Sequence, residues 1–402
     1  MSLFLTDTEE IRLIIDKLKL RSSPGWDKIT SAFLKKYNQV LCKPISHLIN
    51  ISFQTGQFPE TFKESMIVPI HKTGDKLNPS NYRPISLLST LSKIMEKVVN
   101  KRLISYMERN NFLANNQFGF RKSRSTNDAV LLITQKITDY LENGDKCIGV
   151  FLDLQKAFDT VSVKVLLAKL ENYGIRGTVL SWFSDYLSNR KQKVRVGSVI
   201  SDSASASYGI PQGSTLGPTL FLIYINDLCG MSLQKADLLM FADDTVILFH
   251  DSSWETVQDA AEKGLATVTG WLEKNLLTLN TSKTKYVPFY KTSRSKPPNN
   301  FSITIHESPC NRQPSPSQDC VCSKIERTST FKYLGVTLDE NLNWKHHVNT
   351  VAKRIRRLIF IFRKLRAVAD YDLLTKTYKA LCQCLINYCV CSWGGASKTY
   401  IL

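Results

Sequence analysis

Two adjacent aspartates, Asp243 and Asp244, lie between apolar runs at residues 238–240 and 245–249. Both runs are rich in residues that favour strands, so the segment predicts two strands joined by a tight turn. Neighbouring carboxylates on such a turn repel each other unless a cation or a shared proton offsets their charge. A bound divalent metal ion is one explanation of this pattern, and an ordinary hydrophilic hairpin turn is the other.

A third carboxylate, Asp153, ends the apolar run at residues 148–152, which is too short for a helix and predicts a buried strand. Hard cations such as Mg²⁺ take oxygen ligands, and proteins usually supply one or two carboxylates while phosphates and water complete the shell. A pair of such ions can activate an attacking hydroxyl and stabilise the leaving oxygen of a displacement at phosphorus. The aspartates therefore point to phosphoryl or nucleotidyl transfer.

A loop rich in glycine and proline occupies residues 209–218, between these predicted strands, and precedes a helical pattern at residues 219–228. Glycine lets the backbone approach a ligand closely. Pro218 suits the first turn of a helix, whose free N–H groups favour anions. By itself, such a loop indicates a turn more often than a binding site.

Several segments occur in an order that resembles reverse transcriptases. They are residues 81–86 (Asn-Tyr-Arg-Pro-Ile-Ser), 117–121 (Gln-Phe-Gly-Phe-Arg), 151–159 (Phe-Leu-Asp-Leu-Gln-Lys-Ala-Phe-Asp), 209–218, 241–244 (Phe-Ala-Asp-Asp), 279–284 and 331–336. The last is similar to the primer-grip segment of that family. Phe241, where retroviral enzymes usually have tyrosine, favours the non-LTR (LINE-type, jockey-like) retrotransposon class. The resemblance implies an α+β fold, a right-hand polymerase with fingers, a palm with an antiparallel sheet and a helical thumb.

The resemblance also implies catalytic roles. Asp153 and Asp243 match the residues that bind two Mg²⁺ ions, with Mn²⁺ as an alternative cation, and Asp244 lies beside them. Lys283 matches a lysine proposed to protonate the pyrophosphate leaving group, a role that needs an acid placed near the breaking bond.

Further matches imply a nucleotide-binding set. Arg83 and Lys72 match fingers residues that hold the triphosphate, and the planar fork of arginine suits phosphate oxygens. Lys72 also fits the description of an ordinary surface lysine. Phe158 matches the steric gate, an aromatic ring that crowds a ribose 2′-hydroxyl, although a core aromatic is the alternative. Gln212 matches the residue that contacts the incoming nucleotide and the template strand.

Charge favours a polyanionic partner, since 53 Lys and Arg against 35 Asp and Glu give a net charge of +18. Apolar residues recur every three or four positions from Val348 to Leu365, which predicts an amphipathic helix. We expect this thumb helix to lie on the template–primer duplex, although basic residues of this kind more often form an ordinary solvated face. Its nucleic-acid-binding candidates are Lys353, Arg356, Arg357, Arg363 and Lys364.

The chain divides by pattern into an N-terminal helical extension (1–52), fingers and palm (53–338), and a basic helical thumb (339–402) that we expect to be incomplete. The Pro- and Ser-rich range 291–330 predicts a linker with one short strand. Helices are predicted at residues 9–20, 91–107, 127–141, 163–173, 178–187 and 256–275, and a strand at 193–199.

Other features exclude some classes of protein. No apolar run approaches the ~20 residues that span a bilayer, and no signal segment is evident, so we expect an intracellular protein with no membrane partner. The ten cysteines are expected to be reduced thiols. One residue separates the cysteines at 320 and 322, 382 and 384, and 389 and 391, a spacing that disfavours zinc. His346 and His347 are expected on the basic helix surface.

Two functions of different class remain open. The first is an RNA-directed DNA polymerase that adds dNTPs to a DNA primer on an RNA template and depends on a separate endonuclease activity for integration. The second is a catalytically inactive or domesticated fragment that only binds RNA or DNA. RNA-templated RNA synthesis is disfavoured if Phe158 is the gate.

Overall fold

A computed structural model describes residues 1–306 and 322–396 of the 402-residue chain. Two compact units are present, and each is assembled from separate stretches of sequence. The first comprises residues 1–114, 155–230 and 274–277, and the second comprises residues 115–154, 231–273 and 278–402. Both combine helices with a sheet, which confirms the α+β class. The division into segments 1–52, 53–338 and 339–402 remains a prediction.

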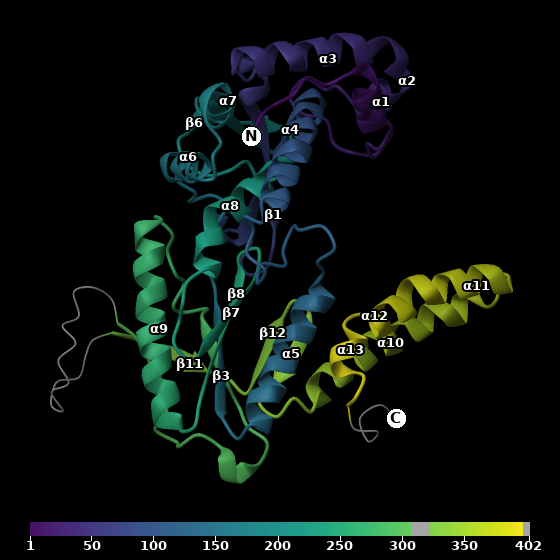
Figure 1. Ribbon diagram of the computed structural model, residues 1–402. Coiled ribbons are helices and arrows are strands. Elements are labelled where there is room, and N and C mark those ends of the chain that lie inside the picture. Colours follow the sequence, from purple (N-terminus) through teal and green to yellow (C-terminus); the bar gives the residue numbers. More distant parts are fainter. Residues whose placement is uncertain (307–321, 397–402) are drawn as a thin grey trace. The chain divides into compact units, whose positions relative to one another are not determined.

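The helices of the first unit occur where apolar periodicity predicts them. Helix α4 buries Ile94, Met95, Val98 and Val99 along one side. The helix predicted at residues 9–20 ends earlier, at Asp16, and a turn follows it. The helices of this unit, coloured from purple to teal in Figure 1, are α1 (Thr8–Asp16), α2 (Ser31–Lys36), α3 (Asn38–Thr55), α4 (Thr90–Arg109), α6 (Val163–Asn172), α7 (Gly177–Leu187) and α8 (Gly217–Cys229).

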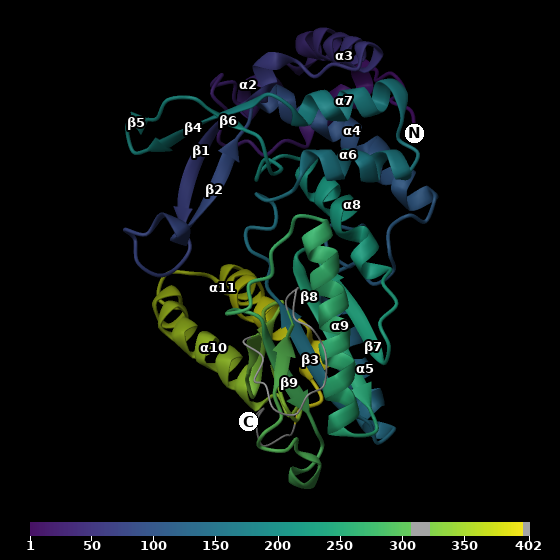
Figure 2. The ribbon, with the colours of Figure 1, turned by 90° about the vertical axis from the view of Figure 1, so that its left-hand side faces the viewer.

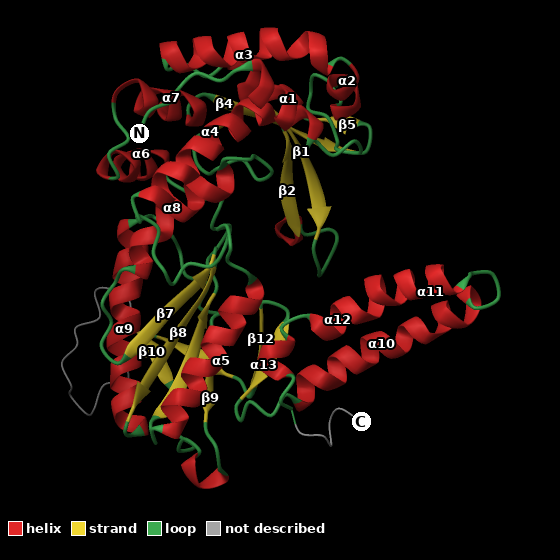
Figure 3. Ribbon diagram, turned by 45° about the vertical axis from the view of Figure 1, so that its right-hand side comes forward, coloured by secondary structure: helices red, strands yellow, loops and turns green. Residues whose placement is uncertain are grey.

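A small sheet completes the first unit (Figure 3). Its order is β2-β1-β4-β5, with β6 also paired to β4, and only β1 and β4 run parallel. The strand predicted at residues 193–199 is wrong in its bounds, because Gly197 adopts a φ of 62° and turns the chain there. The strands are β1 (Glu64–His71), β2 (Tyr82–Leu87), β4 (Arg190–Val196), β5 (Val199–Ile200) and β6 (Ala204–Ala206).

The second unit contains a six-stranded sheet in the order β10-β11-β9-β3-β8-β7. Figure 2 labels its strands β3, β7, β8 and β9. All neighbouring strands are antiparallel except β9 and β11, which run parallel to each other. The strands are β3 (Lys146–Leu152), β7 (Ala236–Phe241), β8 (Asp244–Asp251), β9 (Lys285–Phe289), β10 (Ile303–Ile305) and β11 (Ser323–Arg327).

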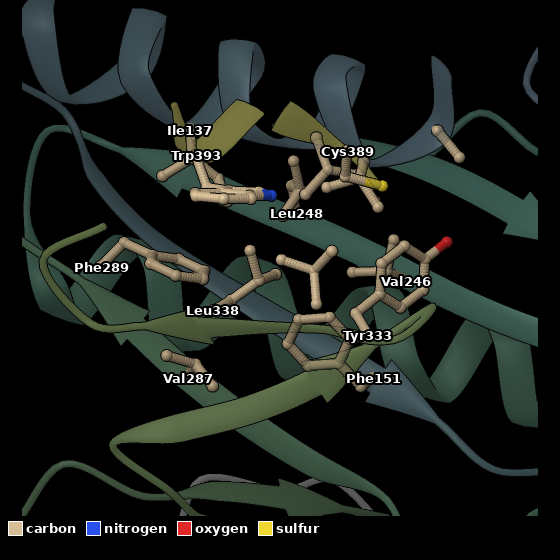
Figure 4. Close-up of a cluster of buried hydrophobic side chains, with 14 of the residues drawn as sticks. Ile137, Phe151, Val246, Leu248, Val287, Phe289, Tyr333, Leu338, Cys389 and Trp393 are labelled. Carbon is tan, nitrogen blue, oxygen red and sulfur yellow. The ribbon is translucent and has the colours of Figure 1, made fainter. Parts of the chain in front are cut away.

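Helices α5 (Thr126–Glu142) and α9 (Trp254–Lys274) cover this sheet. Alternate residues of β8 face opposite ways, as expected in a strand. Leu248 packs in the cluster that includes α5 (Figure 4), whereas the ring of Phe249 lies against Gly264 of α9. A Cβ at Gly264 would lie 2.5 Å from that ring, so only glycine fits there.

The Pro- and Ser-rich range contains more regular structure than a linker with one strand. Both β10 and β11 belong to the six-stranded sheet. Residues 307–321, which hold part of this range, lie outside the described residues. Strand β11 has a single buried side chain, Ile325, so its sequence carries little strand pattern.

The C-terminal segment begins with the hairpin of β12 (Thr330–Tyr333) and β13 (Val336–Asp339) and continues into helices. These helices return to the core, because Cys389 and Trp393 are buried in the cluster of Figure 4. The Tyr388 hydroxyl donates to the carbonyl of Leu334 at 2.5 Å. The helices are α10 (Lys345–Leu365), α11 (Tyr371–Tyr378), α12 (Cys384–Asn387) and α13 (Val390–Trp393), with a π-helical turn at Lys379–Gln383.

Candidate active site

The two adjacent aspartates lie where β7 turns into β8. Phe241 pairs with Asp244, so Ala242 and Asp243 form a two-residue connection. Ala242 adopts a φ of 57°, as the first position of the tight hairpin turns that join such strands requires. Asp243 is half-buried and Asp244 is exposed.

Strand β3 brings the third aspartate to the same end of the sheet. Leu152 of β3 pairs with Thr245 of β8, and continuing this antiparallel register by one residue places Asp153 opposite Asp244. In the described parts of the chain, no three His, Cys, Asp or Glu side chains already gather as a metal-binding group. The strand register brings the backbone of all three aspartates to one edge of the sheet.

Gln117 supports the hairpin turn from inside the unit. Its side chain is completely buried, and its Oε1 accepts hydrogen bonds from the backbone N–H groups of Gly119 (2.8 Å) and Ala242 (3.0 Å). A Cβ on Gly119 would lie 2.3 Å from the Ala242 nitrogen. The segment 117–121, which carries the family resemblance without an assigned role, therefore holds the turn that bears Asp243.

A second segment holds the backbone of Asp153. Its N–H donates to Oγ1 of the buried Thr284 at 3.2 Å, and its carbonyl accepts from the N–H of Asn280 at 2.7 Å. Lys283 lies in the turn between these two contacts, with its N–H donating to the Asn280 carbonyl at 3.1 Å. The Lys283 side chain is exposed.

The two candidate triphosphate ligands occupy one hairpin of the first unit. Arg83 of β2 pairs with Ile70 of β1, and the N–H of Lys72 donates to the Asn81 carbonyl at 2.9 Å. Lys72 directly follows β1 and Arg83 is the second residue of β2, so both residues lie near the same end of this hairpin. Both side chains are exposed and accessible to a ligand.

Gln212 and Phe158 also lie in the first unit. The Gln212 amide donates to Oδ1 of Asp159 at 2.8 Å. Burial raises the pKa of Asp159, and the bond from Gln212 and the charge of Lys156 oppose this rise. Asp159 lies inside a segment that resembles the family, and the sequence gives no sign that it would bind Gln212.

The basic thumb candidates lie on α10 in the second unit. All of them are exposed, as a nucleic-acid-binding helix requires: Lys353, Arg356, Arg357, Arg363 and Lys364. The expectation for His347 is wrong, because this side chain is 3% exposed and its ring packs edge-on against Trp393. His347 lies one turn before the buried Val351, on the side of α10 that packs against the core, which explains why it is not on the helix surface. Burial lowers the pKa of His347.

The cysteines of the described residues are free thiols. Cys382 and Cys389 are buried, and their near neighbours Cys384 and Cys391 are exposed. Cys320 lies outside the described residues.

Within the described ranges, none of the helices combines the length and apolar character needed to cross a membrane.

Comparison with known proteins agrees with this arrangement. The family described as reverse transcriptase (RNA-dependent DNA polymerase) matches residues 70–338. The chain is 32% identical, over 359 residues, to the probable RNA-directed DNA polymerase from transposon BS of Drosophila melanogaster. This alignment covers 86% of this chain and 37% of that protein. It is 27% identical, over 403 residues, to the RNA-directed DNA polymerase from mobile element jockey of the same organism. This second alignment covers 98% of this chain and 42% of that protein.

The chain thus spans about two fifths of the length of these relatives, which bounds what can be transferred from them. The family match includes Asp153, Asp243 and Asp244, as well as the candidate nucleotide-binding residues. The chain therefore belongs to the reverse transcriptase family, and its expected resemblance to the non-LTR retrotransposon class is confirmed.

Proposed function

We propose that this chain is an RNA-directed DNA polymerase that adds dNTPs to the 3′-hydroxyl of a DNA primer on an RNA template. The observation that carries this proposal is the register of β3, β8 and β7, which brings Asp153 opposite Asp244 and places Asp243 on the adjoining turn. A protein that only binds nucleic acid needs none of these carboxylates. Membership of the reverse transcriptase family supports the same reading.

Asp153 and Asp243 would hold two divalent cations, with Asp244 beside them. The donor set fits Mg²⁺, with Mn²⁺ as an alternative, because carboxylate oxygens are the ligands that hard cations prefer. When bound, such ions activate the primer hydroxyl and stabilise charge on the leaving oxygen. The contribution of the protein is to fix the backbone around the ligands: Gln117 accepts from Ala242, which precedes Asp243, and Thr284 accepts from Asp153.

In this proposal, the nucleotide binds to residues of the first unit. Arg83 and Lys72 bind the triphosphate oxygens, and an arginine fork can bond two oxygens at once. Gln212 orients the incoming nucleotide, and the ring of Phe158 excludes a ribose 2′-hydroxyl. The support is that Arg83 and Lys72 are both exposed near the same end of one hairpin, and that the Gln212 amide donates a hydrogen bond to Asp159.

Two further roles belong to the second unit. Lys283 donates a proton to the pyrophosphate leaving group, and the turn that carries it is bonded to the backbone of Asp153. The exposed basic face of α10 binds the template–primer duplex through its phosphates. Integration into DNA would require an endonuclease activity that none of these roles supplies.

Primer extension tests the proposal. A labelled DNA primer on an RNA template is incubated with dNTPs and Mg²⁺, and the unchanged chain is compared with Asp153→Asn and Asp243→Asn. Each substitution keeps the side-chain shape and removes the charge, so we expect the rate to fall by about 100-fold or more. Asp251→Asn is the matched control, because Asp251 lies at the opposite end of β8 and should leave the rate unchanged.

Binding of the same template–primer separates the two functions that the sequence leaves open. Loss of extension with equal binding in the Asp153→Asn and Asp243→Asn variants establishes the carboxylates as catalytic. An unchanged chain that binds the duplex, releases it at high salt and extends no primer contradicts the polymerase proposal, and indicates a nucleic-acid-binding protein.

A further inference from the structure

The loop at residues 209–217 is fastened at its start and in its middle by backbone hydrogen bonds. The N–H of Ile210 donates to the carbonyl of Phe158 at 2.9 Å. The N–H of Ser86, on β2, donates to the carbonyl of Gln212 at 2.8 Å. The loop is therefore tied to two segments that carry candidate nucleotide-binding residues.

Glu96, on helix α4, fastens the end of the same loop. One of its carboxylate oxygens accepts hydrogen bonds from the backbone N–H groups of Thr215 (2.6 Å) and Leu216 (3.4 Å), and the other accepts from the hydroxyl of Ser92 (3.0 Å). Helix α8 begins at Gly217, and its N-cap residue makes no side-chain cap bond. Glu96 supplies an acceptor at this helix start from a different part of the chain.

The burial of Glu96 indicates that more than packing is involved. Its side chain is 0% exposed. Burial raises the pKa of Glu96, while the Arg190 guanidinium and the hydrogen-bond donors oppose that rise. A buried carboxyl group is costly unless its oxygens are bonded, and an apolar side chain would fill the space without that cost. The charge of Arg190, the Ser92 hydroxyl and the two loop N–H groups together stabilise an ionisable group at this position.

We propose that Glu96 is a positioning residue for nucleotide binding: it sets the conformation of residues 212–216 and thereby the direction of the Gln212 side chain. This inference rests on the proposed polymerase function. The Gln212 amide reaches Asp159 at 2.8 Å, and that alignment depends on a loop held on both sides of Gln212. Gly213, between Gln212 and the Glu96 contacts, has a φ of 113°, a backbone conformation that favours glycine.

Steady-state primer extension tests this role when dNTP and template–primer concentrations are varied separately. We expect the KM for dNTP to rise about tenfold in Glu96→Ala, because displacement of the loop by about 1 Å misplaces Gln212. Glu96→Gln keeps one acceptor oxygen, so a smaller rise is expected. The KM for template–primer should rise less than the KM for dNTP in both variants, because the proposed duplex contacts lie mainly on α10.

Arg102→Gln is the matched control on the same helix. Arg102 is 4% exposed and binds Glu10 at 2.9 Å, so its replacement should lower the melting temperature without touching the loop. The dNTP KM of this variant should equal that of the unchanged chain. A dNTP KM that is unaltered in Glu96→Ala, or raised equally in Arg102→Gln, would overturn the inference.

Hydrogen exchange separates failure of this inference from failure of the polymerase proposal. The amides of Thr215 and Leu216 should exchange faster in Glu96→Ala than in Arg102→Gln, whether or not the chain extends a primer. An unchanged chain that extends no primer contradicts the polymerase proposal. Unaltered exchange at positions 215 and 216 in Glu96→Ala contradicts the role of Glu96.

Discussion

The ring of Phe158 has surroundings that suit both of its expected roles. It stacks on Phe221 with centroids 4.3 Å apart and planes tilted by 22°, and it is half-buried. Phe221 is completely buried, so it provides a fixed surface behind the Phe158 ring. Core packing on one face leaves part of the ring accessible to a sugar, and a steric gate needs that rigid support.

Phe158→Val should let the polymerase use ribonucleotides. A smaller side chain makes room for a 2′-hydroxyl, so we expect the ratio of kcat/KM for dNTP over rNTP to fall by about 10- to 100-fold. Primer extension with each nucleotide type measures this ratio. Phe112→Val removes another half-buried ring of the first unit and should leave the ratio unchanged. Unaltered sugar selection in Phe158→Val would show that this ring only packs.

At the scale of elements, the β7–β8 hairpin depends on a segment that precedes it by over a hundred residues. The N–H of Phe118 donates to the carbonyl of Met240 at 2.8 Å. The side-chain oxygen of Gln117 accepts from the N–H of Ala242, which lies 125 positions later in the chain. These contacts hold the turn from behind and leave Asp243 partly accessible. Gly119 is the closest point of approach.

Gly119→Ala should displace this turn, because the new Cβ would meet the Ala242 nitrogen at 2.3 Å. Polymerase activity should fall by about 100-fold, and the free energy of unfolding should fall by about 1–3 kcal/mol. Primer extension and urea unfolding measure the two effects. Gly270→Ala, in helix α9 with open space around it, should instead keep activity and gain about 0.5–1 kcal/mol. Full activity in Gly119→Ala would refute the close approach.

An ion cluster joins helices α1 and α4 in the first unit. Glu10 accepts hydrogen bonds from Arg102 at 2.9 Å, Lys101 at 2.8 Å and Thr6 at 2.7 Å. Burial opposes ionisation of Glu10, but these bonds outweigh it and lower the pKa of Glu10 to about 2. The folded pKa lies below the ordinary value of 4.5, so the cluster stabilises the fold above that value.

Glu10→Gln should therefore lower the free energy of unfolding by about 2 kcal/mol at pH 7. The difference from the unchanged chain should shrink as the pH falls from about 4.5 to about 2, because the unchanged chain then protonates Glu10. Urea unfolding of both proteins at several pH values measures this difference in the free energy of unfolding. Glu9→Gln breaks an exposed ion pair with Arg12 and should change the free energy of unfolding little. A difference that persists undiminished at pH 2 would contradict this account.

Local sequence patterns predicted most helices, because apolar spacing reports directly which side of a helix is buried. The reverse transcriptase fold was predicted differently, from the resemblance of several ordered segments to that family. Strand β11 was missed because pairing with β9 and β10 orders a mostly polar stretch. The roles of Gln117, Asp159 and Glu96 were also invisible, since the hydrogen bond of Glu96 to Thr215 joins positions 119 residues apart. The assigned roles of the aspartates remain predictions.

At the scale of the whole molecule, the net charge of +18 should attract nucleic acid from a distance, while the placement of the basic residues decides where it binds. Arg356 and Arg357 are adjacent and exposed on α10. Each phosphate contact releases counterions, which makes affinity fall as salt rises. The slope of log affinity against log salt therefore reports the number of phosphate contacts.

Replacing Arg356 and Arg357 with Gln should weaken template–primer binding and reduce the slope of log affinity against log salt by about 1 for each lost contact. Fluorescence anisotropy at several salt concentrations measures the slope. Lys17→Gln with Lys19→Gln removes the same charge from exposed positions of the first unit and should alter the slope less. Equal slopes for the two double variants would show that α10 has no special role.

The interleaving of the two units has a consequence for synthesis of the protein. Strand β3, which ends beside Asp153, pairs with β8 and with β9, both of which follow it by many residues. On the ribosome, this apolar strand emerges well before either partner exists, with both of its edges able to pair with another chain. Neither unit can close until its last segment is made. The strand that ends beside Asp153 is thus exposed to pairing with other chains while the rest of the protein is being made.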